Sequence, residues 1–131
     1  MNEVHALAEK LYSNSICLKR QKSSSLMWKK NREKWDAMLA EMLADISEMA
    51  NLWDNSYSYE YLDLLEEMEE ILKACQSALL WQEHGYKEQC SIYMQAFHNL
   101  PRAFLPPENR MRISVAEARE YADFWLEYGS R

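Results

Sequence analysis

Three histidines and three cysteines are the side chains of this sequence best suited to binding a transition metal. Carboxylate-bridged di-iron sites in helical bundles need a glutamate three residues before each of two histidines, and no histidine here has one. Cys75 could join His84, Cys90 and His98 as a fourth ligand. These side chains could meet only if a helix expected over about 86–100 folds back on the helix before it. The close ligand pairs that mark structural zinc are missing. The sequence therefore predicts no metal site and no other cofactor.

A catalytic nucleophile has no better support in the sequence. Nucleophilic catalysis needs a thiolate held beside a base, but Cys75 and Cys90 lie on apolar stripes, where cysteine is usually an inert small hydrophobic residue. Gly85 and Gly129, the two glycines, are too far apart for a phosphate-binding loop or a dinucleotide-binding turn. We expect no catalytic residue, no enzymatic activity and no small-molecule substrate.

The cysteines and the first residues of the chain bear on its location. Cys17, Cys75 and Cys90 are an odd number and include no Cys-x-x-Cys pair, which favours reduced thiols in a cytosol. Glu3 and Glu9 stand where a signal peptide needs a basic start and an apolar run. No stretch approaches the roughly 18 consecutive apolar residues of a membrane span. We expect a soluble, cytoplasmic protein with no membrane partner.

A basic segment at residues 19–34 offers one candidate binding site. Its seven cations are Lys19, Arg20, Lys22, Lys29, Lys30, Arg32 and Lys34, against one anion. Nucleic-acid-binding proteins combine such cations with aromatic stacking platforms, and Trp28 and Trp35 lie in or beside the segment. The same two tryptophans fall on a heptad repeat, which predicts that they are buried. Nucleic-acid binding through this segment is therefore the alternative function and not the first.

The residues that follow are strongly acidic. Residues 36–84 carry twelve Asp and Glu and a single cation, Lys73, for a net charge of −11. One helical face in this region holds five carboxylates: Glu60, Asp63, Glu66, Glu67 and Glu70. Such a face could mimic nucleic-acid phosphates, although most charged faces are simply solvated. The charge polarity between the two regions can serve a partner or join one helix to another within the fold.

Aromatic residues are the feature that burial alone explains least well. The expected turn between two long helices carries four of them, namely Trp53, Tyr57, Tyr59 and Tyr61. The last expected helix carries Tyr121, Phe124, Trp125 and Tyr128, which point in too many directions for one buried face. Tyr and Trp are enriched at protein interfaces because they bury a large area with few rotatable bonds. Of these residues, we expect Trp53, Tyr57, Tyr59, Tyr61, Tyr121, Phe124 and Tyr128 to contact a partner protein or a second copy of the chain.

The elements that must position these side chains are helices. Only seven of 131 residues are the β-branched Val or Ile, Thr is absent, and Gly and Pro together number five. Strands and hairpins need those residue types. Apolar spacing of three and four residues predicts helices over about 3–20, 26–53, 58–84 and 86–100. A capping box at 114–117 begins a fifth helix that extends to about 128.

The expected fold is all-α: a single domain, 1–131, forming an elongated antiparallel bundle of about five helices. It is built on a long hairpin of the second and third helices, with the other three covering the apolar side of that hairpin. We expect Gly85 to cap the third helix in a left-handed conformation. Pro101 should end the fourth, leaving 101–113 as an irregular loop on the core. The expected function is non-enzymatic binding of another macromolecule, most simply a protein. An adaptor, a chaperone-like protein or an inhibitor, such as one encoded by a phage or mobile element, would fit.

Overall fold

The computed structural model describes residues 2–20, 25–52 and 59–130, and all regular structure in them is helical. The helices in chain order are α1 (Asn2–Lys19), α2 (Ser25–Leu52), α3 (Tyr59–Trp81), α4 (Tyr86–Phe97), the 3₁₀ helix η1 (Leu100–Phe104) and α5 (Val115–Gly129). The prediction of an all-α helical bundle is confirmed. Within the described ranges, no helix is both long enough and apolar enough to cross a membrane.

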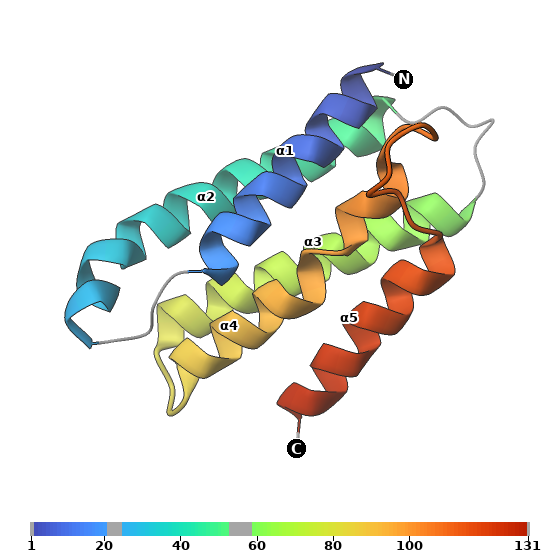
Figure 1. The fold of residues 1–131 in the computed structure, drawn as a ribbon. Helices are drawn as coiled ribbons and strands as arrows, with labels where there is room; N and C mark the ends of the chain where they lie inside the picture. The colour runs from blue at the N-terminus through green and yellow to red at the C-terminus, as the bar shows by residue number, and fades with distance from the viewer. Residues whose placement is uncertain (1, 21–24, 53–58, 131) are drawn as a thin grey trace.

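α1 and α4 pack on the α2–α3 pair and also contact each other (Figure 1). α2 and α3 run antiparallel as the predicted long hairpin, α1 lies along α2, and α4 lies along α3. α5 differs from the expectation, because it packs mainly on α4 and η1 and only lightly on α3. It therefore forms one edge of the bundle, and α2 forms the opposite edge. This arrangement leaves the outer sides of both edge helices without a covering helix.

The core follows the predicted heptad stripes. On α2 the buried members are Trp35, Leu39, Met42, Ile46 and Met49. On α3 the buried residues are Leu64, Leu65, Met68, Ile71, Leu72, Cys75 and Leu79. Spacings of three and four residues place each set on one side of its helix, so the two sets face a common interior. The side chain of Trp28 and the whole of Trp53 lie outside the described residues.

The end of α3 corrects one sequence prediction. The helix stops at Trp81 rather than near residue 84, because Gln82 adopts a left-handed backbone with φ 49°. The Gln82 N–H donates to the Ala78 carbonyl at 3.0 Å, which closes the last turn. Gly85, with φ 78°, stands directly before α4 and not at the end of α3. The left-handed residue that ends α3 is thus a glutamine and not the predicted glycine.

The loop predicted over 101–113 is partly helical. Pro101 lies in the first turn of η1, where a missing backbone N–H costs no hydrogen bond. Phe104 and Leu105 are buried, as expected for a loop that lies on the core. The Arg102 side chain donates to the Met111 carbonyl at 2.7 Å and so ties the start of the loop to its end. This tie brings the chain back to the point where α5 begins.

The start of α5 matches its sequence signal. Ser114 has an extended backbone, and its Oγ accepts a hydrogen bond from the Glu117 N–H at 3.1 Å. This bond satisfies one of the free N–H groups of the first helical turn. The Ser114 half of the predicted capping box is confirmed, whereas the Glu117 side chain makes no return bond to the Ser114 N–H.

We predict that Leu72→Ala lowers the free energy of unfolding by about 2–5 kcal/mol, through lost burial and the cavity that remains. Leu72 is fully buried on α3. The control is Leu80→Ala on the same helix, where the side chain is exposed and the change should stay within about 0.5 kcal/mol. Urea unfolding of both variants measures the difference. Equal losses would show that the described burial of α3 is wrong.

Candidate functional site

The face of α5 that packs on the bundle is built from small side chains. Val115, Ala118 and Ala122 are its buried residues. Near its end, a Cβ added to Gly129 would lie 2.8 Å from Cγ2 of Ile92 on α4. Real Cβ atoms do not approach a neighbour so closely, so α5 and α4 meet here at a distance that only glycine allows. This close contact leaves no room for a larger side chain at position 129.

The large rings of α5 lie on a second stripe that faces solvent. Tyr121 is 47% exposed, Phe124 62% and Tyr128 55%. They are spaced three and four residues apart, so they share one side of the helix. We call Tyr121, Phe124 and Tyr128 the aromatic stripe. The sequence predicted these three residues as an interface, and the structure leaves them uncovered.

Trp125 links the aromatic stripe to the core. Its side chain is half-buried and packs against the core cluster. The Trp125 ring contacts Phe124 edge to face, with centroids 5.4 Å apart, and Tyr128 in the same manner at 5.6 Å. Edge-to-face contacts of this kind favour a defined ring orientation. Two rings of the stripe are therefore held in place before any partner arrives.

Acidic residues border the aromatic stripe. α5 carries four exposed carboxylates, Glu117, Glu120, Asp123 and Glu127. Its single cation, Arg119, donates to Glu67 on α3 at 3.1 Å. That cation is therefore engaged in joining α5 to α3, and the outward surface of α5 keeps a negative charge.

The other predicted aromatic surface, at the turn before α3, is only partly within the described residues. Trp53 and Tyr57 lie outside them. Tyr59 is 83% exposed. Tyr61 is half-buried, and its ring meets Phe104 of η1 edge to face at a centroid distance of 5.4 Å. Tyr61 thus belongs to the margin of the core, and of the two described residues Tyr59 is the exposed one.

The sequence prediction missed several large exposed residues, of which Leu80 and Trp81 are the most exposed. Leu80 is 67% exposed and Trp81 72%, both in the last turn of α3. Trp81 borders a hollow of about 410 Å³ between α3 and α4 that Tyr86 and Tyr93 also line. Helical spacing could have predicted their exposure, because neither residue continues the three-and-four spacing of the buried α3 stripe after Leu79.

The basic residues of the N-terminal region are partly used within the fold. The Lys10 ammonium lies 2.7 Å from a Glu41 carboxylate oxygen and donates to Asp45 at 3.3 Å, which joins α1 to α2. Lys19 donates to Nε2 of His98 at 3.5 Å, which joins α1 to the end of α4. Part of the charge polarity therefore connects helices, which was one of the two roles expected for it.

The remaining predicted nucleic-acid residues do not form a described patch. Arg20 and Lys34 are exposed, and Arg32 is half-buried. Lys22 and the side chains of Lys29 and Lys30 lie outside the described residues. Nucleic-acid binding by the basic segment stays a prediction.

The five predicted acidic residues are divided by the structure. Glu67 is bound by Arg119 of α5. Asp63, Glu66 and Glu70 are exposed and make no ion pair with any residue in the described ranges. Glu60 is exposed beside the start of α5, in the hollow that Glu117 also lines. The face expected of a nucleic-acid mimic is therefore smaller than five residues.

The buried thiols are in an environment that suppresses their reactivity. Cys90 Sγ lies 3.9 Å from the Cys75 carbonyl and donates to it. The neighbouring Cys90 thiol and burial raise the pKa of Cys75 well above its ordinary value of 9.0, which disfavours a thiolate. In the part of the chain that the structure describes, no three His, Cys, Asp or Glu side chains are grouped as metal ligands.

We predict that Cys17 reacts with a thiol reagent faster than either other cysteine at neutral pH. Cys17 is partly exposed, whereas Cys75 and Cys90 are fully buried, and reaction needs an accessible thiolate. Mass spectrometry of the alkylated native protein identifies the modified residue, and denatured protein serves as the fully labelled control. Preferential labelling of Cys75 in native protein would contradict this assignment.

We predict that stability falls as the pH drops below the ordinary histidine pKa, partly because of His98. Burial first, and then the charge of Lys19, lower the pKa of His98 below 6.5. Between these two pKa values the unfolded chain binds a proton that the folded chain does not, so acid favours unfolding. Above 6.5 both states are neutral and the effect of His98 is absent.

The comparison that isolates this effect is with His98→Gln. Urea midpoints at about pH 7.5 and about pH 5.5 bracket the window. The decrease in the urea midpoint from the higher pH to the lower should be smaller in the variant than in the native protein. Equal losses in the two proteins would show that His98 does not contribute.

Comparison with known proteins finds no match to a protein-family model, to a curated protein or to a solved structure. The function must therefore be inferred from the surfaces of the chain itself. Among the described surfaces, the aromatic stripe of α5 combines large exposed rings, fixed ring orientation and a bordering charge of one sign.

Proposed function

We propose that this protein acts without catalysis, by binding another protein on the aromatic stripe of α5. One observation carries the proposal: three large rings are exposed on a helix whose opposite side is already packed on α4. An extended group of exposed apolar side chains marks an interaction site more often than chance. Tyr and other aromatic residues are also the usual energetic centres of protein interfaces.

The arrangement of the rings supports tight binding. Association costs free energy for every side chain that must become ordered. Phe124 and Tyr128 are already oriented by their contacts with Trp125, so less ordering remains to be done. Tyr121 and Tyr128 also keep hydroxyl groups that can donate to a partner at the edge of the contact.

The charges around the stripe define the chemistry of the partner. Four carboxylates border the rings, and the single cation of α5 is engaged with Glu67. A partner surface of complementary charge would be apolar at its centre and carry Lys or Arg at its rim. An adaptor or an inhibitor of a basic protein meets this description. Three cysteines with no Cys-x-x-Cys pair favour a cytoplasmic location.

We predict that replacing Tyr121, Phe124 and Tyr128 together with alanine lowers affinity for the partner at least about a hundredfold, because interface aromatics carry the binding energy. The native protein, immobilised through its N-terminus, first captures the partner from lysate of the source cells. Binding of the purified partner is then measured for both proteins by surface plasmon resonance. Most of the loss should appear as a faster off-rate.

A matched control removes exposed apolar area elsewhere. Leu80 and Trp81 are at least as exposed as the aromatic stripe, and they lie at the end of α3. The double alanine variant of these two residues should keep affinity within about twofold. Circular dichroism melts verify that both variants fold. Full affinity in the α5 triple variant would disprove the proposal.

A further inference from the structure

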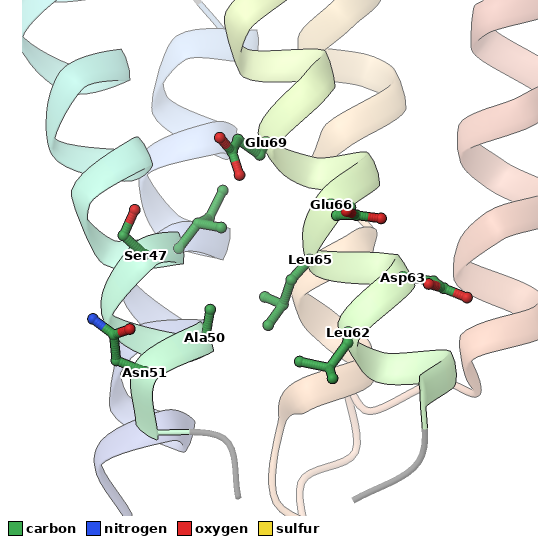
Figure 2. Close-up of a pocket in the computed structure, with 9 residues that line it drawn as sticks. Ser47, Ala50, Asn51, Leu62, Asp63, Leu65, Glu66 and Glu69 are labelled. Carbon is green, nitrogen blue, oxygen red and sulfur yellow. The ribbon is translucent and has the colours of Figure 1, made fainter. Parts of the chain in front are cut away.

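Another hollow lies between α2 and α3, away from α5 (Figure 2). It has a volume of about 390 Å³. From α2 it is lined by small or short side chains, Ser47, Ala50 and Asn51, and from α3 by Leu62 and Leu65. Figure 2 shows both leucines pointing toward α2, with Ala50 opposite them. The hollow exists because α2, apart from the buried Ile46, places only small or short side chains against these leucines.

The floor of this hollow is apolar and buried. Ile46 and Leu65 are almost completely buried beneath it, and the half-buried Leu62 packs against the same core. The residues that line the groove lie between Ile46 and Asn51 on α2 and between Leu62 and Glu69 on α3. These segments are six and eight residues long. At 1.5 Å per residue this is about 10 Å, or two helical turns. A groove of that length and composition suits the apolar side of one helix.

The charge around the groove is negative on one side only. Asp63, Glu66 and Glu69 of α3 line it, whereas α2 contributes the neutral Ser47 and Asn51. Lys73, 2.6 Å away, neutralises Glu69. Asp63 and Glu66 make no ion pair with any described residue, and in Figure 2 both point away from α2, on the other side of α3 from Leu62 and Leu65.

The surrounding sequence supplies no cation to complete this surface. Residues 36–84 contain twelve carboxylates and one lysine, and that lysine is Lys73. The uncompensated charge of residues 36–84 therefore requires cations from outside this segment for electrostatic complementarity. A carboxylate edge beside an apolar floor is the complement of a helix with leucine-like anchors and Lys or Arg on one flank.

We propose that the α2–α3 groove docks a cationic amphipathic helix of a partner protein. Two apolar anchors, three or four residues apart, lie on Ile46, Leu62 and Leu65, while the Lys or Arg residues of the helix reach Asp63 and Glu66. This surface is separate from the aromatic stripe, because α2 and α5 form opposite edges of the bundle (Figure 1). The protein can therefore hold two protein segments at once.

The test uses a synthetic probe in place of the unidentified partner. The probe is a fluorescein-labelled helical peptide of leucine and lysine, about 14 residues or roughly four turns long, with the leucines on one side. A second peptide carries glutamate at every lysine position. The lysine peptide should bind the native protein saturably in fluorescence anisotropy, and the glutamate peptide should not. Absence of saturable binding by the lysine peptide overturns the proposal.

Two pairs of variants separate groove binding from general charge attraction. Asp63→Asn with Glu66→Gln should weaken binding about fivefold or more, as expected when two ion pairs are lost. Asp36→Asn with Glu48→Gln removes the same charge from exposed positions of α2 that do not line the groove, and should change affinity less than about twofold. Equal weakening by the two pairs overturns the proposal.

Two single substitutions on α2 test whether the shape of the groove is needed for binding. Ala50→Phe fills the groove, and Ala44→Phe makes the same change at an exposed position of α2 outside it. Only Ala50→Phe should abolish saturable binding, and both variants are compared at equal helicity by circular dichroism. Binding that survives Ala50→Phe overturns the proposal.

Two further measurements separate helix docking in the groove from binding on the aromatic stripe and from self-association. The alanine triple variant of the aromatic stripe should bind the lysine peptide as the native protein does, so failure of the proposed function leaves this result unaffected. Sedimentation equilibrium tests whether a second copy fills the groove instead. A native dimer that Ala50→Phe converts to a monomer would overturn the proposal in favour of self-association.

Discussion

Covering the apolar side of α3 is the constraint on which the rest of the structure depends. Its seven buried residues cannot be shielded by one neighbour, so α2 packs on one flank and α4 on the other. That choice turns the outer side of α2 to solvent and leaves the groove above Leu62 and Leu65 uncovered. It also moves α5 away from the hairpin and onto α4. Both candidate docking surfaces are consequences of how α3 is buried.

Residue size decides which side of α5 is buried. The contact with α4 depends on alanines and on Gly129, where a methyl group would already collide with Ile92. Large rings cannot enter such a contact without separating the helices. Tyr121, Phe124 and Tyr128 are therefore left on the far side. Trp125, at the boundary between the two stripes, is half-buried and orients two of these rings.

Charge has two roles in this molecule. Some ion pairs join helices that are distant in sequence, as Lys10 does for α1 and α2 and Arg119 does for α5 and α3. Exposed pairs of this kind add little to stability, but they favour one arrangement of helices over others. Other carboxylates, among them Glu120 and Asp123 on α5 and Asp63 and Glu66 beside the groove, are exposed next to apolar surface. These positions are where a partner with basic residues gains most.

The sequence by itself determined the helical class, the buried stripes of α2 and α3 and the cap at Ser114, because each depends on residues close together in the chain. Helix ends were predicted to within about three residues, and α3 ended earlier because Gln82 took the left-handed turn expected of Gly85. Periodicity also identified α5 as rich in aromatic residues. It could not tell which of two apolar stripes would be covered, since that depends on how closely a distant helix approaches. Only the tertiary structure could decide that Tyr61 packs on Phe104, that Trp81 stays exposed, and that a groove opens between α2 and α3.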